Sequence, residues 1–174
     1  MKVSRGAITL SSEMTIDANL DMNSYVITEV GGVTLVKNAG IQILTALVAD
    51  KDFCGDTVLA TAGEDIDQFE VVYLKSDGKV WKAKGDSSAT MPIKGIATAN
   101  VLADAAGVFL IKGFIRKDAW NWAIGDILYA SDVTGGAITA TIPDTSGDQI
   151  QAVGIAVTAD IAWFRPDLIL AEVT

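Results

Sequence analysis

The sequence contains no histidine and only one cysteine, Cys54. The missing histidine excludes catalysis by Ser-His-Asp or Cys-His groups and the common zinc sites that use imidazole ligands. One cysteine cannot form a disulfide within the chain, so we expect stability to depend on packing. No neighbouring cation would activate the Cys54 thiol, and we therefore interpret Cys54 as a small buried apolar residue.

Long apolar runs are also missing, although 50% of the residues are hydrophobic and the mean hydropathy is +0.37. No run approaches the roughly 18 residues that span a bilayer, since Asp104 and Lys112 interrupt the richest stretch, residues 101–115. Lys2 and Arg5 are followed by polar residues, so no signal peptide is expected. The apolar excess is therefore expected to be buried within the fold or between subunits, with no membrane partner.

Positive charge is scarce as well. The chain has 13 basic and 22 acidic residues, for a net charge of −9. Binding to a phosphate backbone depends on clusters of Lys and Arg, whereas here Lys79, Lys82 and Lys84 are the densest group. The composition therefore disfavours nucleic acid as a partner.

The first part of the chain contains a strictly alternating segment, residues 13–23. In an extended strand, apolar side chains would line one face, while Thr, Asp and Asn would line the other. Little local sequence is available to cover the apolar face, so a neighbouring molecule or the chain's own domain must do so. We predict an extended β arm within residues 1–56 whose assembly interface includes Met14, Ile16, Leu20, Met22 and Ile27.

Short apolar and β-branched stretches recur from residue 57 onward, separated by Gly, Asp and Ser. Such spacing is typical of a sandwich or barrel. Asp77-Gly78 predicts a hairpin with a type I′ turn, because both central residues of that turn need positive φ, and Gly135-Gly136 takes the corresponding place later in the chain. The predicted strands are residues 57–60, 71–75, 80–83, 93–97, 108–114, 127–130, 138–141, 151–158 and 168–173.

An internal repeat links two of these hairpins. Residues 65–73 align without gaps on residues 121–129, and residues 94–99 resemble residues 153–158. Each copy contains an acidic residue before a strand that ends in Tyr, and a later Gly-Ile-Ala strand. Glu70 and Asp126 can bond turn amides, while Gly95 and Gly154 suit a bulge or a close strand crossing. We predict an all-β fold, a small pseudo-two-fold β-barrel or sandwich over residues 57–174, with copies at about 63–99 and 119–158.

This repeated pattern resembles the small β-barrel domains of tailed-phage capsid decoration proteins, and similar domains at the ends of phage tail and head fibres. The likeness covers about residues 60–173, and residues 15–32 are similar to strand segments of trimeric phage fibres. The resemblance implies a virion structural protein without catalysis or cofactor. It also implies a homotrimer, with the major capsid protein or other virion proteins as partners.

Two groups of acidic and amide side chains are candidates for an ion or catalytic site. Glu64, Asp65 and Asp67 lie beside a glycine in an expected turn, where capping and solubility explain them better than acid–base work. The second group shares one strand face, but an EF-hand loop that begins at its first member would need Gly and Glu where Met22 and Thr28 stand. A solvated strand face is favoured for this second group: Asp17, Asn19, Asp21 and Asn23.

Trp120 and Trp122 form the most unusual local feature. On a strand, alternate positions would place both rings on one face, as in a sugar-binding platform. The same rings can instead close a barrel end or fill a seam between subunits, and burial is the favoured interpretation. With the tryptophans read as buried, the resemblance implies a capsid decoration protein that bridges subunits of a shell. The alternative is a trimeric fibre or adhesin domain that binds a host-surface glycan.

Overall fold

The computed structural model describes residues 47–174, which form an all-β unit. One short 3₁₀ turn, η1 (Ser88–Thr90), interrupts the strands. The strands are β1 (Phe53–Thr61), β2 (Val71–Leu74), β3 (Val80–Lys82), β4 (Ile93–Ala97), β5 (Ala106–Arg116), β6 (Ile127–Ala130), β7 (Ile138–Thr139), β8 (Gln149–Ile150), β9 (Ala152–Ala156), β10 (Ile161–Phe164) and β11 (Ala171–Glu172).

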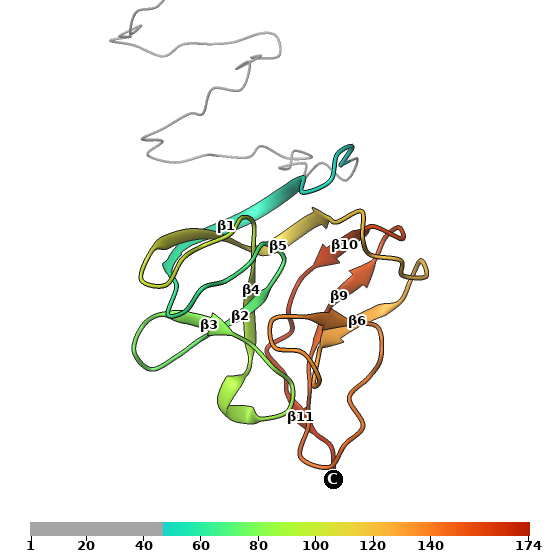
Figure 1. Cartoon of the computed structure of the whole chain (residues 1–174). Helices are drawn as coiled ribbons and strands as arrows, with labels where there is room; N and C mark the ends of the chain where they lie inside the picture. The colour runs from blue at the N-terminus through green and yellow to red at the C-terminus, as the bar shows by residue number, and fades with distance from the viewer. Residues whose placement is uncertain (1–46) are drawn as a thin grey trace, which may run out of the picture. The chain divides into compact units, whose positions relative to one another are not determined.

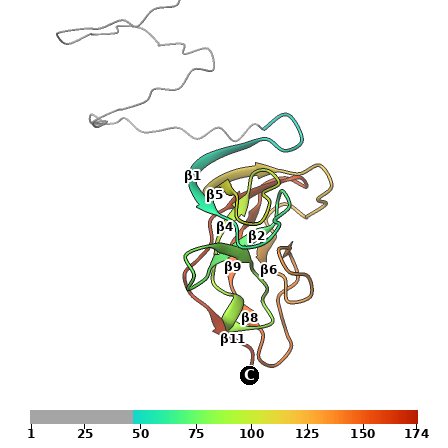
Figure 2. The same ribbon diagram turned by 60° about the vertical axis from the view of Figure 1, so that its left-hand side comes forward.

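Nine strands form one strongly curled sheet in the order β3-β2-β4-β5-β10-β9-β6-β7, with β1 added on β5. Strands β8 and β11 form a separate two-stranded sheet. The strands of the two sequence copies lie on either side of the β5–β10 pair (Figure 1). Figure 2 shows β1 along β5 at one end of the unit, with the C-terminus at the other. The order reads symmetrically outward from that central pair, as a duplicated sequence predicts.

The repeat extends to individual hydrogen bonds. The amide of Ala97 donates to the carbonyl of Glu70 at 2.9 Å, and the amide of Ala156 donates to the carbonyl of Asp126 at 2.9 Å. Each of the two acidic side chains also accepts from an amide three residues earlier, at 2.7 Å for Glu70 and 3.0 Å for Asp126. The predicted role of this acidic pair in turn capping is therefore confirmed.

Matching β-bulges also occur in both copies. The register shifts as β2 passes Gly95 of β4, and it shifts again as β6 passes Gly154 of β9. An ideal Cβ on Gly154 would lie 2.3 Å from the carbonyl oxygen of Trp163, so no larger residue fits there without movement. The predicted bulge at these glycines is confirmed.

The β2–β3 hairpin is present, but its predicted type I′ turn is wrong. Lys75 donates to the carbonyl of Lys79 at 3.0 Å, which leaves three residues in the loop. Only Gly78 among the three has positive φ, at 80°. A type I turn followed by glycine in the left-handed region is the usual geometry for a loop of that length. The residue pair predicted the hairpin, whereas the pairing of the flanking strands decided the turn.

Two hydrophobic cores lie on opposite faces of the sheet. The main core collects buried side chains from both copies, including Val71, Ile96, Leu110, Leu128 and Phe164. The outer core lies under the first copy alone, and it consists of Ala62, Ile66, Val72, Val80, Ala97, Val101 and Phe109.

A β-bulge in β5 changes which face of the sheet is buried. Asp56 pairs with Lys112 and Thr57 with Leu110, so Ile111 has no partner on β1. Leu110 and Ile115 both point into the main core, although regular alternation would place them on opposite faces. One inserted residue moves every side chain that follows it to the opposite face of the sheet. The second copy therefore exposes positions that the first copy buries.

Several predicted boundaries differ from the structure. Strand β1 begins at Phe53, so residues 53–56, which the sequence assigned to the arm, pair with β5. The strand predicted at residues 168–173 shortens to β11, and β8 and β10 had no predicted counterpart. Strand β10 follows a connection of only residues 157–160, which offers no glycine or proline to mark a break.

Candidate assembly surface

A continuous row of apolar side chains crosses the outer face of the second half of the sheet. Trp163 pairs with Phe114 on one side and with Ile155 on the other, and Ile155 pairs with Ile127. We name these four residues, from β5, β10, β9 and β6, the apolar row. Exposed fractions are 41% for Trp163, 42% for Ile155 and 48% for Ile127, and the Phe114 and Trp163 rings stack with centroids 5.9 Å apart. Directly paired strand residues share one face, so the row forms a single surface.

A hollow of about 630 Å³ lies against this row. Ile127, Ile155 and Trp163 line it together with the segment after β10, where Leu168 is 71% exposed. The only charged residues in its lining are Arg165 and Asp167. We name this hollow the row groove; it presents mostly apolar side chains to solvent.

The apolar row is exposed because the connections between β4 and β5 and between β9 and β10 differ in length. In the first half, Ile66 and Val101 exchange backbone hydrogen bonds at 2.8 Å and seal the outer core. Val101 lies in the connection between β4 and β5, residues 98–105, which folds over the sheet. The matching connection between β9 and β10 covers only residues 157–160. It closes as a tight turn, so no equivalent segment within residues 47–174 covers the apolar row.

A second apolar hollow, of about 520 Å³, lies between β1 and the β4–β5 connection. We name it the loop groove. It is lined by Phe53, Leu59, Leu102 and Val108, among others, and by no charged residue. Leu59 and Leu102 are each 70% exposed. Strand β1 pairs only with β5 among the described strands, so its other edge adds exposed backbone groups to this surface.

Trp120 and Trp122 do not lie on a strand, contrary to the geometry expected from their spacing. They belong to the connection between β5 and β6, where their rings stack with centroids 4.2 Å apart. Phe69 meets Trp120 edge to face at 5.7 Å, and both tryptophans are half-buried against the main core. The ammonium group of Lys117 lies 5.1 Å from the Phe69 ring. The ring faces are largely occupied by one another and by these neighbours.

The first carboxylate group is engaged in structural bonds. Glu64 accepts from the amide of Lys82 at 2.9 Å, and Asp65 accepts from the amide of Ala103 at 2.8 Å. Partial burial lowers the pKa of Lys82, but a 3.0 Å contact with Glu70 outweighs it, and the pKa is raised. These bonds agree with turn capping. Within residues 47–174, no group of His, Cys, Asp or Glu is arranged to hold a metal ion.

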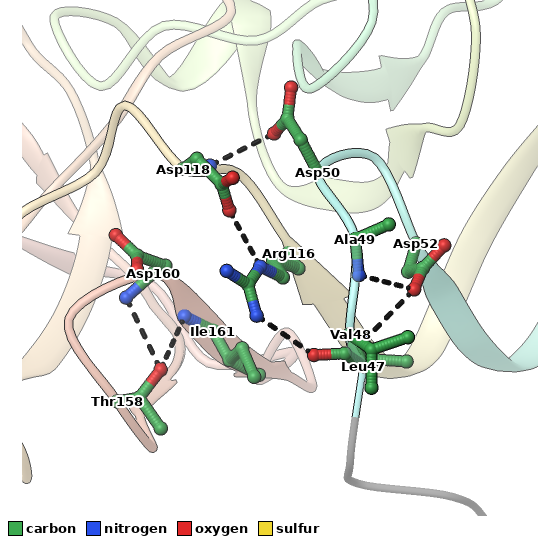
Figure 3. Close-up of polar contacts among 10 residues, drawn as sticks. All are labelled: Leu47, Val48, Ala49, Asp50, Asp52, Arg116, Asp118, Thr158, Asp160 and Ile161. Atoms are coloured by element: carbon green, nitrogen blue, oxygen red, sulfur yellow. Dashed lines mark hydrogen bonds and ion pairs between the residues drawn. The ribbon is translucent and has the colours of Figure 1, made fainter.

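Arg116 holds Leu47, the first described residue, against the end of β5 (Figure 3). Its guanidinium donates to the carbonyl of Leu47 at 3.0 Å and to Asp118 at 2.6 Å. The hydrogen bond with Asp118 raises the pKa of Arg116, so the group stays charged. The amide of Asp118 in turn donates to the carboxylate of Asp50 at 2.9 Å. The chain therefore enters at the end of β5, two residues beyond Phe114 of the apolar row.

The residues predicted for the arm interface, and the second carboxylate group, lie outside the described residues: Met14, Ile16, Leu20, Met22, Ile27, Asp17, Asn19, Asp21 and Asn23. Cys54 is half-buried on β1, opposite Phe114, rather than fully buried as expected. No helix among the described residues is long and apolar enough to cross a membrane.

The apolar row is not predictable from local sequence, because its members come from four strands. The one available signal was the apolar content of both alternating positions in residues 127–130.

Comparison of the chain with protein-family models, with curated proteins and with solved structures finds no match.

Proposed function

We propose that this chain is a structural protein of a virus particle, a capsid decoration protein that stabilises the shell by bridging subunits. The observation that carries the proposal is the apolar row, an ordered strip of large apolar side chains across four strands that the described chain leaves uncovered. Scattered exposed apolar residues are ordinary, whereas contiguous patches mark interaction sites. The resemblance of the repeat to phage decoration domains supplies the identity of the assembly.

The mechanism of such a protein is burial. At about 25 cal/mol per Å², the removal of roughly 1,000 Å² of apolar surface from water contributes about 25 kcal/mol before ordering costs. Contacts of that kind across subunit boundaries raise the free energy needed to open a shell. No catalytic group is required, and the partners we propose are further copies of the chain, as a homotrimer, and the major capsid protein.

Electron microscopy of purified particles, with an antibody raised against residues 47–174, tests this proposal. We expect label at regularly repeated positions on the outside of the capsid. Removal of the protein should lower the temperature at which the shells release their contents. Particles that lack the protein, or shells whose stability is unchanged by its removal, would contradict it.

A second candidate is a fibre domain that binds a host-surface glycan, and one observation favours it. A hollow of about 370 Å³ beside Trp120 is lined by Gln68, Glu70 and Lys117, and a ring edge with hydrogen-bonding groups is a common setting for sugars. Titration with host-surface glycans should then change tryptophan fluorescence, and Trp120→Ala should abolish the change. Label at fibre tips rather than on the capsid would favour this candidate.

A further inference from the structure

We propose that the row groove of one copy binds the loop groove of a second copy, so that the chain assembles head to tail. The inference rests on the proposed structural role and names the self-contact within it. The partner is another copy of this chain, presenting strand β1 and the β4–β5 connection. The contact surface is made of Trp163, Ile155 and Ile127 on one side, and of Leu59 and Leu102 on the other.

Residues 47–174 leave two separate apolar surfaces exposed, the row groove and the loop groove. A symmetric contact of the row groove with itself would cover one surface and leave the loop groove in water. A head-to-tail contact joins two different surfaces, and it closes into a ring when the rotation between copies allows. In such a ring every copy buries both grooves, whereas a contact of the row groove with itself buries only one of them.

The chemistry of the two linings is compatible. The loop groove has no charged residue in its lining, and the row groove has only Arg165 and Asp167. Interface cores are depleted in charge and enriched in aromatic residues, here Trp163 and Phe53. Arg165 forms none of the ion pairs found among residues 47–174.

The exposed area is sufficient for a specific contact. Large side chains bury on the order of 150–250 Å² when fully covered. The exposed fractions of Leu168 at 71%, Leu59 at 70% and Leu102 at 70% leave much of that area in water. With the apolar row, the two grooves together offer on the order of 1,000 Å², about the area that a biological protein interface has to exceed.

Paired charge substitutions test the inference on the full chain. Ile155→Lys changes the row groove and Leu102→Lys changes the loop groove; both side chains are exposed, so the fold should persist. Sedimentation velocity should show that each variant alone raises the dissociation constant for self-association at least about tenfold. Leu74→Lys is the matched control, because Leu74 is 60% exposed on β2 and lines neither groove. Circular dichroism and thermal unfolding verify that all three variants are folded.

Mixing the two variants gives the decisive result. In a head-to-tail contact, the intact row groove of the Leu102→Lys chain still fits the intact loop groove of the Ile155→Lys chain. The mixture should therefore form a one-to-one pair, although neither variant associates alone. The same charge is used in both so that the two altered surfaces repel each other.

Other outcomes would overturn the inference. If Ile155→Lys blocks association and Leu102→Lys does not, the row groove pairs with itself. If neither substitution weakens association, the grooves are not the contact between copies. Ile127→Lys repeats the row test in case Ile155→Lys fails to fold. These results are independent of the particle experiment, so a decoration protein that assembles through another surface would fail here and still label capsids.

Discussion

Gln151 shows how much of this fold depends on one polar side chain. It is fully buried, and its amide accepts from the Ile93 amide at 2.7 Å, donates to the Ile93 carbonyl at 3.2 Å and donates to the carbonyl of Asp167. These bonds join the first strand after η1 to the second sequence copy. A buried polar group is tolerable only when it is fully paired, and here the pairing links the two halves.

Gln151→Leu should lower the free energy of unfolding by about 2–4 kcal/mol, because it removes the side-chain partner of the buried Ile93 amide and carbonyl and of the Asp167 carbonyl. Urea unfolding at neutral pH measures the change. Gln68→Leu is the control, since Gln68 is half-buried and its side chain forms only one hydrogen bond, at 2.8 Å to the Thr98 carbonyl. A loss at Gln151 no larger than that at Gln68 would contradict this account.

Asp77 gives a pH-dependent prediction at the same scale. The amide of Lys79 donates to its carboxylate at 2.9 Å, and the Trp81 indole donates at 3.0 Å. The hydrogen bond from the Lys79 amide lowers the pKa of Asp77, and the bond from the Trp81 indole lowers it further. A lowered pKa in the folded state means that the contribution of Asp77 is present above its unfolded pKa, and that it is lost as pH falls through the folded value.

Asp77→Ala should therefore lower the thermal midpoint at about pH 7, and the difference from the parent protein should shrink towards about pH 2.5. Differential scanning calorimetry at both values measures this. Ser76→Ala, in the same loop, should have no such pH dependence. A difference that grows in acid would show that the carboxylate is not the stabilising form.

Gly95 and Gly154 each lie at a β-bulge between two paired strands. They have the same place in the repeat, yet their surroundings differ. A Cβ on Gly154 would lie 2.3 Å from the Trp163 carbonyl oxygen, whereas one on Gly95 would lie 3.3 Å from that of Leu110. The first distance requires β9 and β10 to separate, and the second requires an adjustment of a few tenths of an ångström.

Gly154→Ala should cost at least about 2 kcal/mol of unfolding free energy, because overpacking displaces backbone that pairs within the sheet. Gly95→Ala should cost about 1 kcal/mol or less by the same reasoning. Urea unfolding of both variants provides the comparison. Equal effects would mean that the close β9–β10 approach is not rigid, and the apolar row would then lose its fixed geometry.

At the scale of the whole molecule, net charge and exposed apolar surface act in opposite directions. Copies that each carry −9 repel one another, while the apolar row and the loop groove attract. Raising sodium chloride from about 0.1 M to about 1 M shortens the screening length from ~10 Å to ~3 Å. Repulsion between copies is thereby reduced, but apolar burial is retained.

Self-association should therefore become stronger, or stay unchanged, as salt increases. Sedimentation equilibrium at several salt concentrations measures the dissociation constant. The Ile155→Lys variant serves as the comparison, because loss of the apolar contact should leave little association to strengthen. Dissociation at high salt would instead indicate that ion pairs hold the copies together.

Local sequence alone determined the positions of most strands, though not of β8 and β10, together with the duplication and the acidic caps at Glu70 and Asp126. Alternation, glycines and short-range hydrogen bonds act within a few residues, so the sequence is sufficient to predict them. It also predicted the all-β class, since the apolar stretches are short and regularly spaced.

The tertiary structure decided which side of each strand is buried. The bulge at Ile111 reverses the facing of the strands beyond it, and the short β9–β10 connection leaves Trp163 and Ile155 uncovered. Likewise, the stacking of Trp120 on Trp122 depends on a loop that packs beside Phe69, which is distant in sequence. The side of a strand that is buried, and the surface that a loop covers, both depend on chain segments far apart in the sequence. Local periodicity carries no information about either.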